Sequence, residues 1–378
     1  MIMGFLTLRN FLKIFIGRIL LLNLFALLAV QGSALASVTG LQQMVGQMIM
    51  VGFQGNNTNS AGFVAVRDDI EAGRIGGVMY LRFNVSSLGN VEKMNAAFIA
   101  ANDSLAPFIA LDQEGGRVER LTKDVGFGEI PSAARIAATQ NLRQAQDTYF
   151  AMASDLSDLR FNLNLGPVVD LNINPNNPII ARFQRSYGID SNVVTSYATS
   201  FIDAHRQAGI LSALKHFPGH GSSRADTHEG FVDISDYWQP EELAPYRNLI
   251  RAGKVDMVMM AHLFHERFSN ADGAQLPASL SKSWIDGVLR NELGYNGVVI
   301  SDDMEMGAIT ARFSMEEAII LAVEAGTDIL LFSNTANYRP GLAKEISDIL
   351  IAKAQVDPAF MARIEQSYGR IVRLKQNL

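Results

Sequence analysis

Short hydrophobic runs recur along the chain, and each is separated from the next by a stretch long enough to form a helix. Because these runs are apolar without interruption, they predict strands buried on both faces, as in a parallel sheet covered by helices. The candidate strands are residues 48–52, 76–81, 108–111, 162–169, 211–214, 256–260, 297–300 and 328–332. The candidate helices are residues 91–102, 142–159, 191–208, 240–252, 282–292 and 315–325.

Eight strand–helix units in one chain predict an α/β protein with a (β/α)8 barrel of the TIM type and long loops after the strands. A doubly wound parallel sheet is the alternative that the same pattern allows. Hydrophobic residues make up 48% of the chain and charged residues 19%, which is typical of a protein with a large core. No Pro/Ser-rich linker or internal repeat divides the sequence, so we expect one catalytic domain over residues 37–378.

The first 36 residues have the pattern of a secretory signal peptide. Arg9, Lys13 and Arg18 precede an apolar segment at residues 19–30, and Ala34-Leu35-Ala36 is a small-x-small cleavage signal. We predict that this leader is removed or kept as a membrane anchor, and that the protein is periplasmic or secreted. An uncleaved leader is the only membrane link we expect. The net charge of −6 and the lack of a Lys/Arg run argue against a nucleic-acid partner.

Polar residues follow five of the predicted strands, at the ends where a barrel gathers its active site. Such clusters can also serve only to cap the next helix, but five of them on one rim favour a site. The clusters are Asp112-Gln113-Glu114-Gly115-Gly116-Arg117, Asp170-Leu171-Asn172, Lys215-His216, His262 and Ser301-Asp302-Asp303.

Two of the candidate groups have spacing suited to acid–base and nucleophilic chemistry. Asp226 lies two residues before His228, so its carboxylate can orient the imidazole if both side chains point the same way. Asp302 and Asp303 are neighbours at a strand end. Because adjacent strand residues point to opposite sides, we expect one of the two acids to face the barrel mouth as a nucleophile or base.

The spacing of His216 and His220 would suit a metal only on a helix. Pro218 and Gly219 lie between them and disfavour a helix, so no metal site is predicted.

Five motifs in this order resemble glycoside hydrolase family three, in its β-N-acetylhexosaminidase branch, and they run through most of the chain after the leader. Thr227 stands where the family usually has serine, and it keeps the hydroxyl group. The residues after the eighth predicted strand are enough for one or two helices only. We therefore expect the form of this family that has a single domain. The motifs are Ala110-Leu111-Asp112-Gln113-Glu114-Gly115-Gly116-Arg117-Val118-Glu119-Arg120-Leu121, Gln184-Arg185-Ser186-Tyr187-Gly188, residues 215–228, Pro277-Ala278-Ser279-Leu280-Ser281 and Ser301-Asp302-Asp303-Met304-Glu305-Met306.

The resemblance implies a role for each matching residue. Asp302 would be the nucleophile, and His228 would be the general acid/base with Asp226 as its partner on a mobile loop. A second group would hold the hydroxyl groups of the sugar at the cleavage site. That group is Asp112, Arg120, Arg185, Lys215, His216 and, as a further candidate, His262.

The implied activity is that of a retaining exo-β-N-acetylglucosaminidase, which removes terminal N-acetylglucosamine (GlcNAc) from cell-wall fragments (muropeptides) or chitin oligomers. The expected partner is therefore a small carbohydrate, and no metal or cofactor is implied. A β-glucosidase or a phosphate-dependent glycosidase of the same family is an alternative. A metal-dependent hydrolase and a non-catalytic exported sugar-binding protein are alternatives of other classes.

Overall fold

The computed structural model describes residues 40–102, 105–269, 275–335 and 337–378. The predicted signal peptide, residues 1–36, lies outside the described residues and stays a prediction. Within those four ranges, no helix has the length and apolar character needed to cross a membrane. Residues 44–378 form one compact unit.

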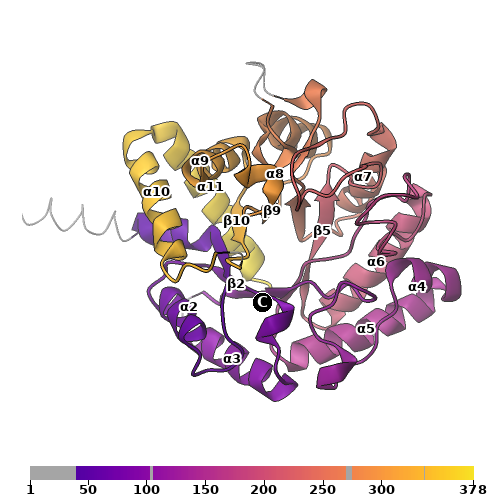
Figure 1. Cartoon of the computed structure of the whole chain (residues 1–378), viewed down its shortest axis with the longest axis horizontal. Coiled ribbons are helices and arrows are strands. Elements are labelled where there is room, and N and C mark those ends of the chain that lie inside the picture. Colours follow the sequence, from indigo (N-terminus) through magenta and orange to yellow (C-terminus); the bar gives the residue numbers. More distant parts are fainter. Residues whose placement is uncertain (1–39, 103–104, 270–274, 336) are drawn as a thin grey trace, which may run out of the picture. The chain divides into compact units, whose positions relative to one another are not determined.

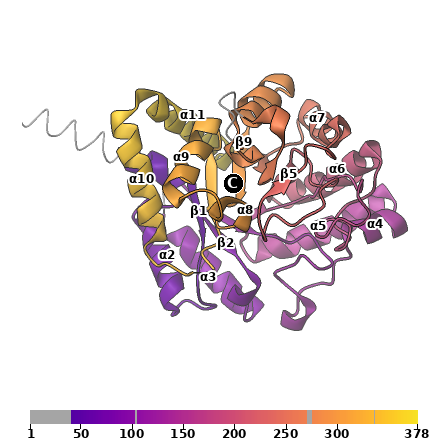
Figure 2. The same cartoon turned by 45° about the horizontal axis from the view of Figure 1, so that its top comes forward.

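Eight parallel strands close into a barrel, and helices surround it (Figures 1 and 2). The predicted (β/α)8 fold is confirmed, and the doubly wound alternative is wrong because β1 and β10 pair and close the sheet. The strands follow one another around the barrel as β1 (Ile49–Gly52), β2 (Gly77–Tyr80), β3 (Phe108–Leu111), β4 (Leu163–Asn164), β5 (Leu211–Phe217), β7 (Met257–Met260), β9 (Val298–Asp303) and β10 (Ile329–Phe332).

Helices form at all six predicted places. Asn141 and Ser314 cap α5 and α9. Each side chain accepts from the N–H of the third helical residue, and each cap N–H donates in return to the side chain of that residue. The α-helices are α2 (Ala61–Glu71), α3 (Leu88–Ala100), α4 (Ala133–Thr139), α5 (Leu142–Asp158), α6 (Ser191–Gln207), α7 (Ala244–Arg251), α8 (Gly307–Thr310), α9 (Met315–Ala325), α10 (Leu342–Val356) and α11 (Pro358–Lys375). Shorter 3-10 turns are η1 (Arg82–Asn84), η2 (Lys123–Val125), η3 (Pro240–Leu243), η4 (Glu266–Phe268) and η5 (Ala278–Leu280), and η6 (Ser283–Glu292) is a π-helix.

The fourth strand is shorter than predicted, because Pro167 has no N–H to give to a ladder. The chain nevertheless stays bonded to β5. The backbone N–H of Ala213 donates to Gly166 O at 2.9 Å, and that of Val169 donates to Lys215 O at 2.8 Å. The segment therefore still delivers the residue after it, Asp170, to the rim of the barrel.

A second, two-stranded sheet was not predicted, since its strands are only two residues long. It pairs β6 (Val232–Asp233) with β8 (Leu263–Phe264). Trp238 packs against the buried cluster that this sheet forms with its neighbours. Through the hydrogen bonds of this sheet, the long loop after β5 is connected to the loop after β7.

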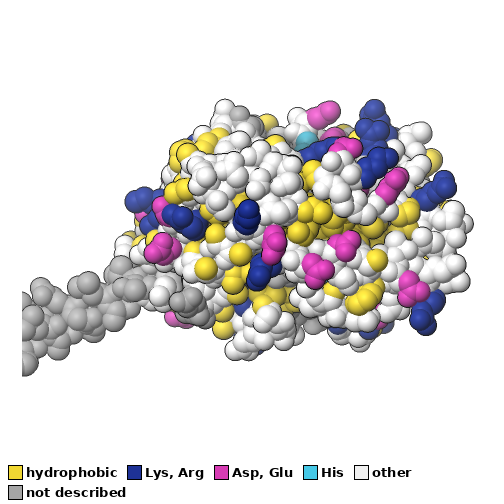
Figure 3. Space-filling view, turned by 90° about the horizontal axis from the view of Figure 1, so that it is seen from below, with side chains coloured by type: hydrophobic (Ala, Val, Ile, Leu, Met, Phe, Trp, Pro, Cys, Tyr) yellow, Lys and Arg dark blue, Asp and Glu magenta, His cyan; other side chains and the backbone are white. Residues whose placement is uncertain are grey.

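On the face shown in Figure 3, basic side chains occur in small groups mixed with acidic ones. The expectation that the protein has no nucleic-acid partner stays a prediction.

The last turn of α11 covers the amino ends of β1 and β2. Lys375 is buried there, and its Nζ donates at 2.7 Å to both Gln47 Oε1 and Gly76 O. The Nζ atom also lies 4.5 Å from the centre of the Phe108 ring. Burial lowers the pKa of Lys375 from 10.5 to about 7, and two acceptors match the two N–H bonds of a neutral amine.

This lysine should make stability depend on pH. Between about pH 7 and 10 the unfolded chain holds a proton on Lys375 that the folded chain lacks, so the free energy of unfolding rises with pH by up to about 1.4 kcal/mol per unit. In urea denaturation, the unfolding free energy of the wild type minus that of Lys375→Met should therefore increase from pH 7 to pH 9. The exposed Lys93→Met is the control and should show a constant difference. A constant difference for Lys375→Met would contradict the prediction.

Candidate active site

The carboxyl ends of the barrel strands surround a cavity of about 390 Å³. Eight of the nine predicted site residues line it, although they come from distant parts of the sequence. They are Asp112, Arg120, Arg185, Lys215, His216, Asp226, His228 and Asp302.

A buried lysine lies at the centre of the charges in this cavity. Lys215 Nζ is 2.6 Å from Asp112 Oδ1 and 2.7 Å from Glu114 Oε1, and the lysine side chain is 2% exposed. Arg120 Nη2 donates to the other oxygen of Asp112 at 2.6 Å. Burial by itself raises the pKa of Asp112, but the charges of Lys215 and Arg120 outweigh burial and hold this pKa well below its usual value. Asp112 is therefore an anion with both oxygens fixed.

Arg185 and Glu114 form a second buried ion pair beside it. The guanidinium donates two parallel bonds to the carboxylate, at 2.8 Å from Nε and 2.7 Å from Nη2. Burial alone would raise the pKa of Glu114, but Arg185 and Lys215 lower it to about 2. Arg185 Nη2 also lies 3.2 Å from His216 Nε2, so the pair is connected to the next strand end.

Asp170 holds the end of β5 in place. Its Oδ2 is 2.7 Å from His216 Nδ1, and its Oδ1 accepts from the backbone N–H groups of His216 and His220 at 3.2 and 2.8 Å. Asp170 and Glu114 belong to the strand-end clusters of the sequence but were not selected as site residues. Their position at strand ends was the available signal.

Asp302 and Asp303 differ in their surroundings. Asp302 Oδ1 accepts from the N–H of Asp303 at 2.8 Å, while Asp303 Oδ1 accepts from the N–H groups of Glu305 and Ser333 at 3.1 and 2.9 Å. Burial raises the pKa of Asp302, but His262, His216 and the N–H of Asp303 outweigh burial and lower it. Asp302 is thus an ionised carboxylate in the cavity. Asp303 lines the cavity as well, contrary to the expectation that only one of the two acids does, but its Oδ1 is occupied by two backbone N–H groups.

His262 is fully buried and does not line the cavity. Its Nδ1 is 2.7 Å from Ser279 Oγ, and its Nε2 is 2.9 Å from the carbonyl oxygen of Asp303. Because a carbonyl only accepts, Nε2 donates this bond. The structure therefore places His262 against the backbone of the Asp302–Asp303 pair, and the predicted contact with a sugar has no counterpart in the cavity lining.

Asp226 and His228 point the same way. Asp226 Oδ1 is 2.7 Å from His228 Nδ1 and accepts from the backbone N–H of His228 at 2.9 Å. The loop that carries them is bonded to the chain after β9. Gly307 N–H donates to His228 O at 3.2 Å, and a Cβ on Gly307 would lie only 2.7 Å from that oxygen. A glycine is therefore needed for this approach.

His220 is the second histidine of the pair whose spacing would suit a metal only on a helix. Its Nδ1 is 2.6 Å from Ser223 Oγ, and burial lowers its pKa to about 4. In the part of the chain that the structure describes, no three or more His, Asp or Glu side chains are grouped as metal ligands. The expected lack of a metal stays a prediction.

Residues 40–374 match the sequence model described as the glycosyl hydrolase family 3 N-terminal domain. The chain belongs to this family, and the resemblance in its motifs is confirmed.

Three similar proteins are named as hexosaminidases or as an N-acetylglucosaminidase. Beta-hexosaminidase A of Pseudoalteromonas piscicida is 32% identical over 326 residues, which make up 80% of this chain and 54% of that protein. The chain thus spans about half of the length of this relative. A family 3 beta-N-acetylglucosaminidase from Paenibacillus sp. str. FPU-7 has a TM-score of 0.79 and 34% identity, over 89% of this chain and 62% of that one. For the beta-N-acetylhexosaminidase of Beutenbergia cavernae DSM 12333 the TM-score is 0.76 and the identity 30%, over 89% and 98% of the two chains.

Proposed function

We propose that this protein is a retaining exo-β-N-acetylglucosaminidase that removes terminal GlcNAc from cell-wall fragments or chitin oligomers. The observation that carries the proposal is the placement of Asp302 in one cavity with the Asp226–His228 pair. The names of the family relatives support the acetamido sugar as substrate.

In the proposed reaction, Asp302 attacks the anomeric carbon while protonated His228 gives its proton to the departing oxygen. A covalent bond forms between Asp302 and the sugar as the glycosidic bond breaks. His228 then takes a proton from water, whose oxygen attacks the same carbon and releases Asp302. Asp226 orients the imidazole and stabilises its charged form.

The buried ion pairs supply the rest of the subsite. Asp112 and Lys215 present fixed charges to the cavity, and Arg120 and Arg185 add donors around them. The ring of His216 lines the same cavity, where its Nε2 accepts from Arg185 Nη2. Because these groups are already paired and immobile, they bind sugar hydroxyl groups with little loss of side-chain entropy.

The first test is the hydrolysis of 4-nitrophenyl N-acetyl-β-D-glucosaminide and of the corresponding β-glucoside by residues 37–378. We expect rapid release from the acetamido sugar and little from the glucoside. No release from either sugar by the folded protein would overturn the proposal. Formation of GlcNAc 1-phosphate on addition of inorganic phosphate would instead identify a phosphate-dependent enzyme.

The location of the protein follows from the leader and is also a proposal. A signal peptide over residues 1–36 would bring the enzyme to the periplasm or the medium, where cell-wall fragments are accessible. Fractionation of the cells that express the full chain tests this, and activity confined to the cytoplasmic fraction would contradict it.

Asp226→Asn should lower kcat/KM and shift its pH profile. An amide can still contact the imidazole of His228, but it stabilises the charged form less than a carboxylate does. The measurement is kcat/KM for the nitrophenyl substrate between pH 4 and 10. Asp236→Asn, an exposed acid in the same loop, is the control. An unchanged profile for Asp226→Asn would remove Asp226 from the mechanism.

A further inference from the structure

The motif at residues 277–281 contributes no side chain to the lining of the catalytic cavity. Its Ser279 is fully buried, and the hydroxyl oxygen lies 2.7 Å from His262 Nδ1. Two further bonds fix Ser279 to the barrel. Its N–H donates to Ala261 O at 3.1 Å, and its carbonyl oxygen accepts from the hydroxyl group of Thr327 at 3.2 Å. The motif therefore holds one hydroxyl group in a set position against His262.

The two contacts of the His262 imidazole select one of its tautomers. Nε2 lies 2.9 Å from the carbonyl oxygen of Asp303, which can only accept, so Nε2 carries the proton. Burial lowers the pKa of His262 and outweighs the opposite effects of Asp302 and Asp303, while the charge of His228 acts in the same direction as burial. The imidazole is therefore neutral at pH 7, and its Nδ1 accepts from the Ser279 hydroxyl group.

The backbone of Asp303 connects His262 to the proposed nucleophile. The peptide group after Asp303 is held on both sides, because its N–H, from Met304, donates to Leu331 O at 2.9 Å and its carbonyl oxygen accepts from His262. The N–H of Asp303 donates to Asp302 Oδ1 at 2.8 Å. Among the described residues, this is the one hydrogen bond to the Asp302 side chain. The direction of that carboxylate therefore depends on the orientation of the Asp303 backbone.

We propose that His262 is a positioning residue for the Asp302 carboxylate and that Ser279 selects the tautomer that this role requires. The inference rests on the proposed glycosidase function and adds two residues that do not line the cavity. A buried carbonyl oxygen without a donor is costly, so the Asp303 backbone would move if His262 were lost. Because attack on the anomeric carbon needs a precisely placed carboxylate, such a movement slows bond formation more than it weakens sugar binding.

Two substitutions at position 262 test this role. His262→Phe keeps an aromatic ring but provides no donor, whereas the side-chain amide in His262→Gln can still donate to the Asp303 carbonyl group. We expect His262→Phe to lower kcat for the nitrophenyl acetamido sugar by about 100-fold and to change KM by less than about threefold. His262→Gln should recover about tenfold of this loss, which a merely structural role of the ring would not produce.

Ser279 and Ser281 provide a matched pair within the same motif. Both are fully buried, but the Ser281 hydroxyl group donates to Phe268 O at 2.6 Å. Ser279→Ala should lower kcat by about tenfold, because His262 Nδ1 then loses its donor and the other tautomer becomes accessible. Ser281→Ala also removes a buried hydrogen bond but should keep kcat within about twofold of wild type. This pair decides the question if His262→Phe does not fold.

Nitrogen NMR of the protein with isotope-labelled histidine reads the tautomer without any substrate. The resonances of His262 are assigned by their absence from His262→Gln. In wild type at pH 7 we expect a proton on Nε2 and none on Nδ1, and in Ser279→Ala a mixture of the two tautomers.

The outcomes separate the positioning role from the glycosidase itself. Equal losses in His262→Phe and His262→Gln, wild-type kcat in folded His262→Phe, or a higher KM at unchanged kcat would overturn the role of His262 while the glycosidase stands. Equal effects of Ser279→Ala and Ser281→Ala would overturn the role of Ser279. A charged or Nδ1-protonated His262 in wild type would overturn the inference whether or not a sugar is cleaved. A folded wild type that cleaves no sugar would overturn both proposals.

Discussion

Asp302→Ala should reduce kcat for the nitrophenyl acetamido sugar by about 10⁴-fold or more, since removal of a nucleophile leaves only binding and orientation to act on the substrate. The variant should fold, because the described residues show only one hydrogen bond to the Asp302 side chain, from the N–H of the next residue. Steady-state hydrolysis and a circular dichroism spectrum are the measurements.

The neighbouring acid provides the control for this prediction. In Asp303→Asn the amide oxygen can still accept from the N–H groups of Glu305 and Ser333, so we expect a loss of less than about tenfold. A large loss for Asp303→Asn together with an active Asp302→Ala would exchange the roles of the two acids.

Lys215→Met should lower the free energy of unfolding by about 3 kcal/mol or more and also abolish activity. The substitution removes the buried cation between Asp112 and Glu114 and leaves two carboxylates less than fully compensated. Urea denaturation at pH 7 measures the loss. Lys254→Met is the matched control, because the Lys254–Asp203 pair has the same 2.6 Å separation but is about one-third exposed. We expect less than about 1 kcal/mol there.

The pH dependence gives a second check on Lys215. The lowered pKa of Asp112 and of Glu114 means that their ion pairs stabilise the folded state above the ordinary carboxyl pKa and cease to do so as the pH falls. Without Lys215 this contribution is smaller. Between about pH 5 and pH 3 the wild type should therefore lose more stability than Lys215→Met does. A parallel decline of both proteins would show that Lys215 does not set these pKa values.

The barrel was predictable because its strands are continuous apolar runs with helix-length spacers, and periodicity carries that signal. Four of the eight site residues that line the cavity, Asp112, Lys215, His216 and Asp302, were predictable from strand ends, whereas Arg120 and Arg185 were indicated only by the family motifs. The short β6–β8 sheet was not predictable, since two-residue strands have no periodicity. The direction of His262 was not predictable either, because it depends on two partners, Ser279 and the Asp303 carbonyl, that only the folded chain brings near.

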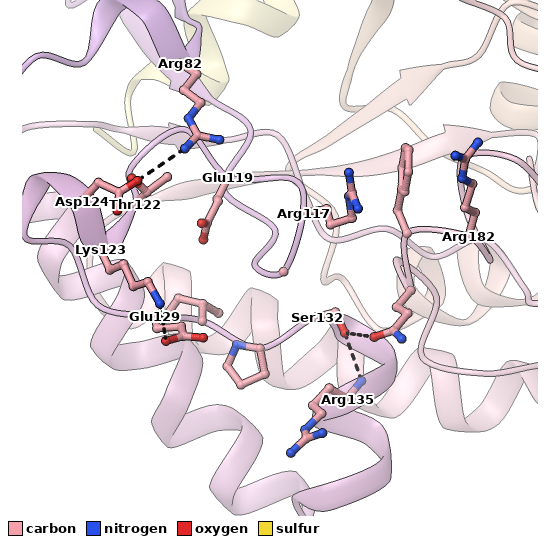
Figure 4. A pocket seen from close by; sticks show the side chains of 15 residues that line it. Arg82, Arg117, Glu119, Thr122, Lys123, Asp124, Glu129, Ser132, Arg135 and Arg182 are labelled. Atoms are coloured by element: carbon pink, nitrogen blue, oxygen red, sulfur yellow. Dashed lines mark hydrogen bonds and ion pairs between the residues drawn. The ribbon is translucent and has the colours of Figure 1, made fainter.

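A cavity of about 930 Å³ that is lined by Arg117, Arg135 and Arg182 was not predictable either (Figure 4). Arg117 follows β3, Arg135 lies in α4, and Arg182 lies in the loop after β4, so no spacing rule connects them. Two loops and the helix α4 bring these three side chains to the same cavity.

The side chains of residues 117–120 alternate between two cavities, which has a consequence for protein engineering. Since Arg117 and Glu119 line a cavity of about 930 Å³ and Val118 and Arg120 line the candidate active site, a mutant library at positions 117 and 119 can change the first cavity and leave the side chains of the second unchanged.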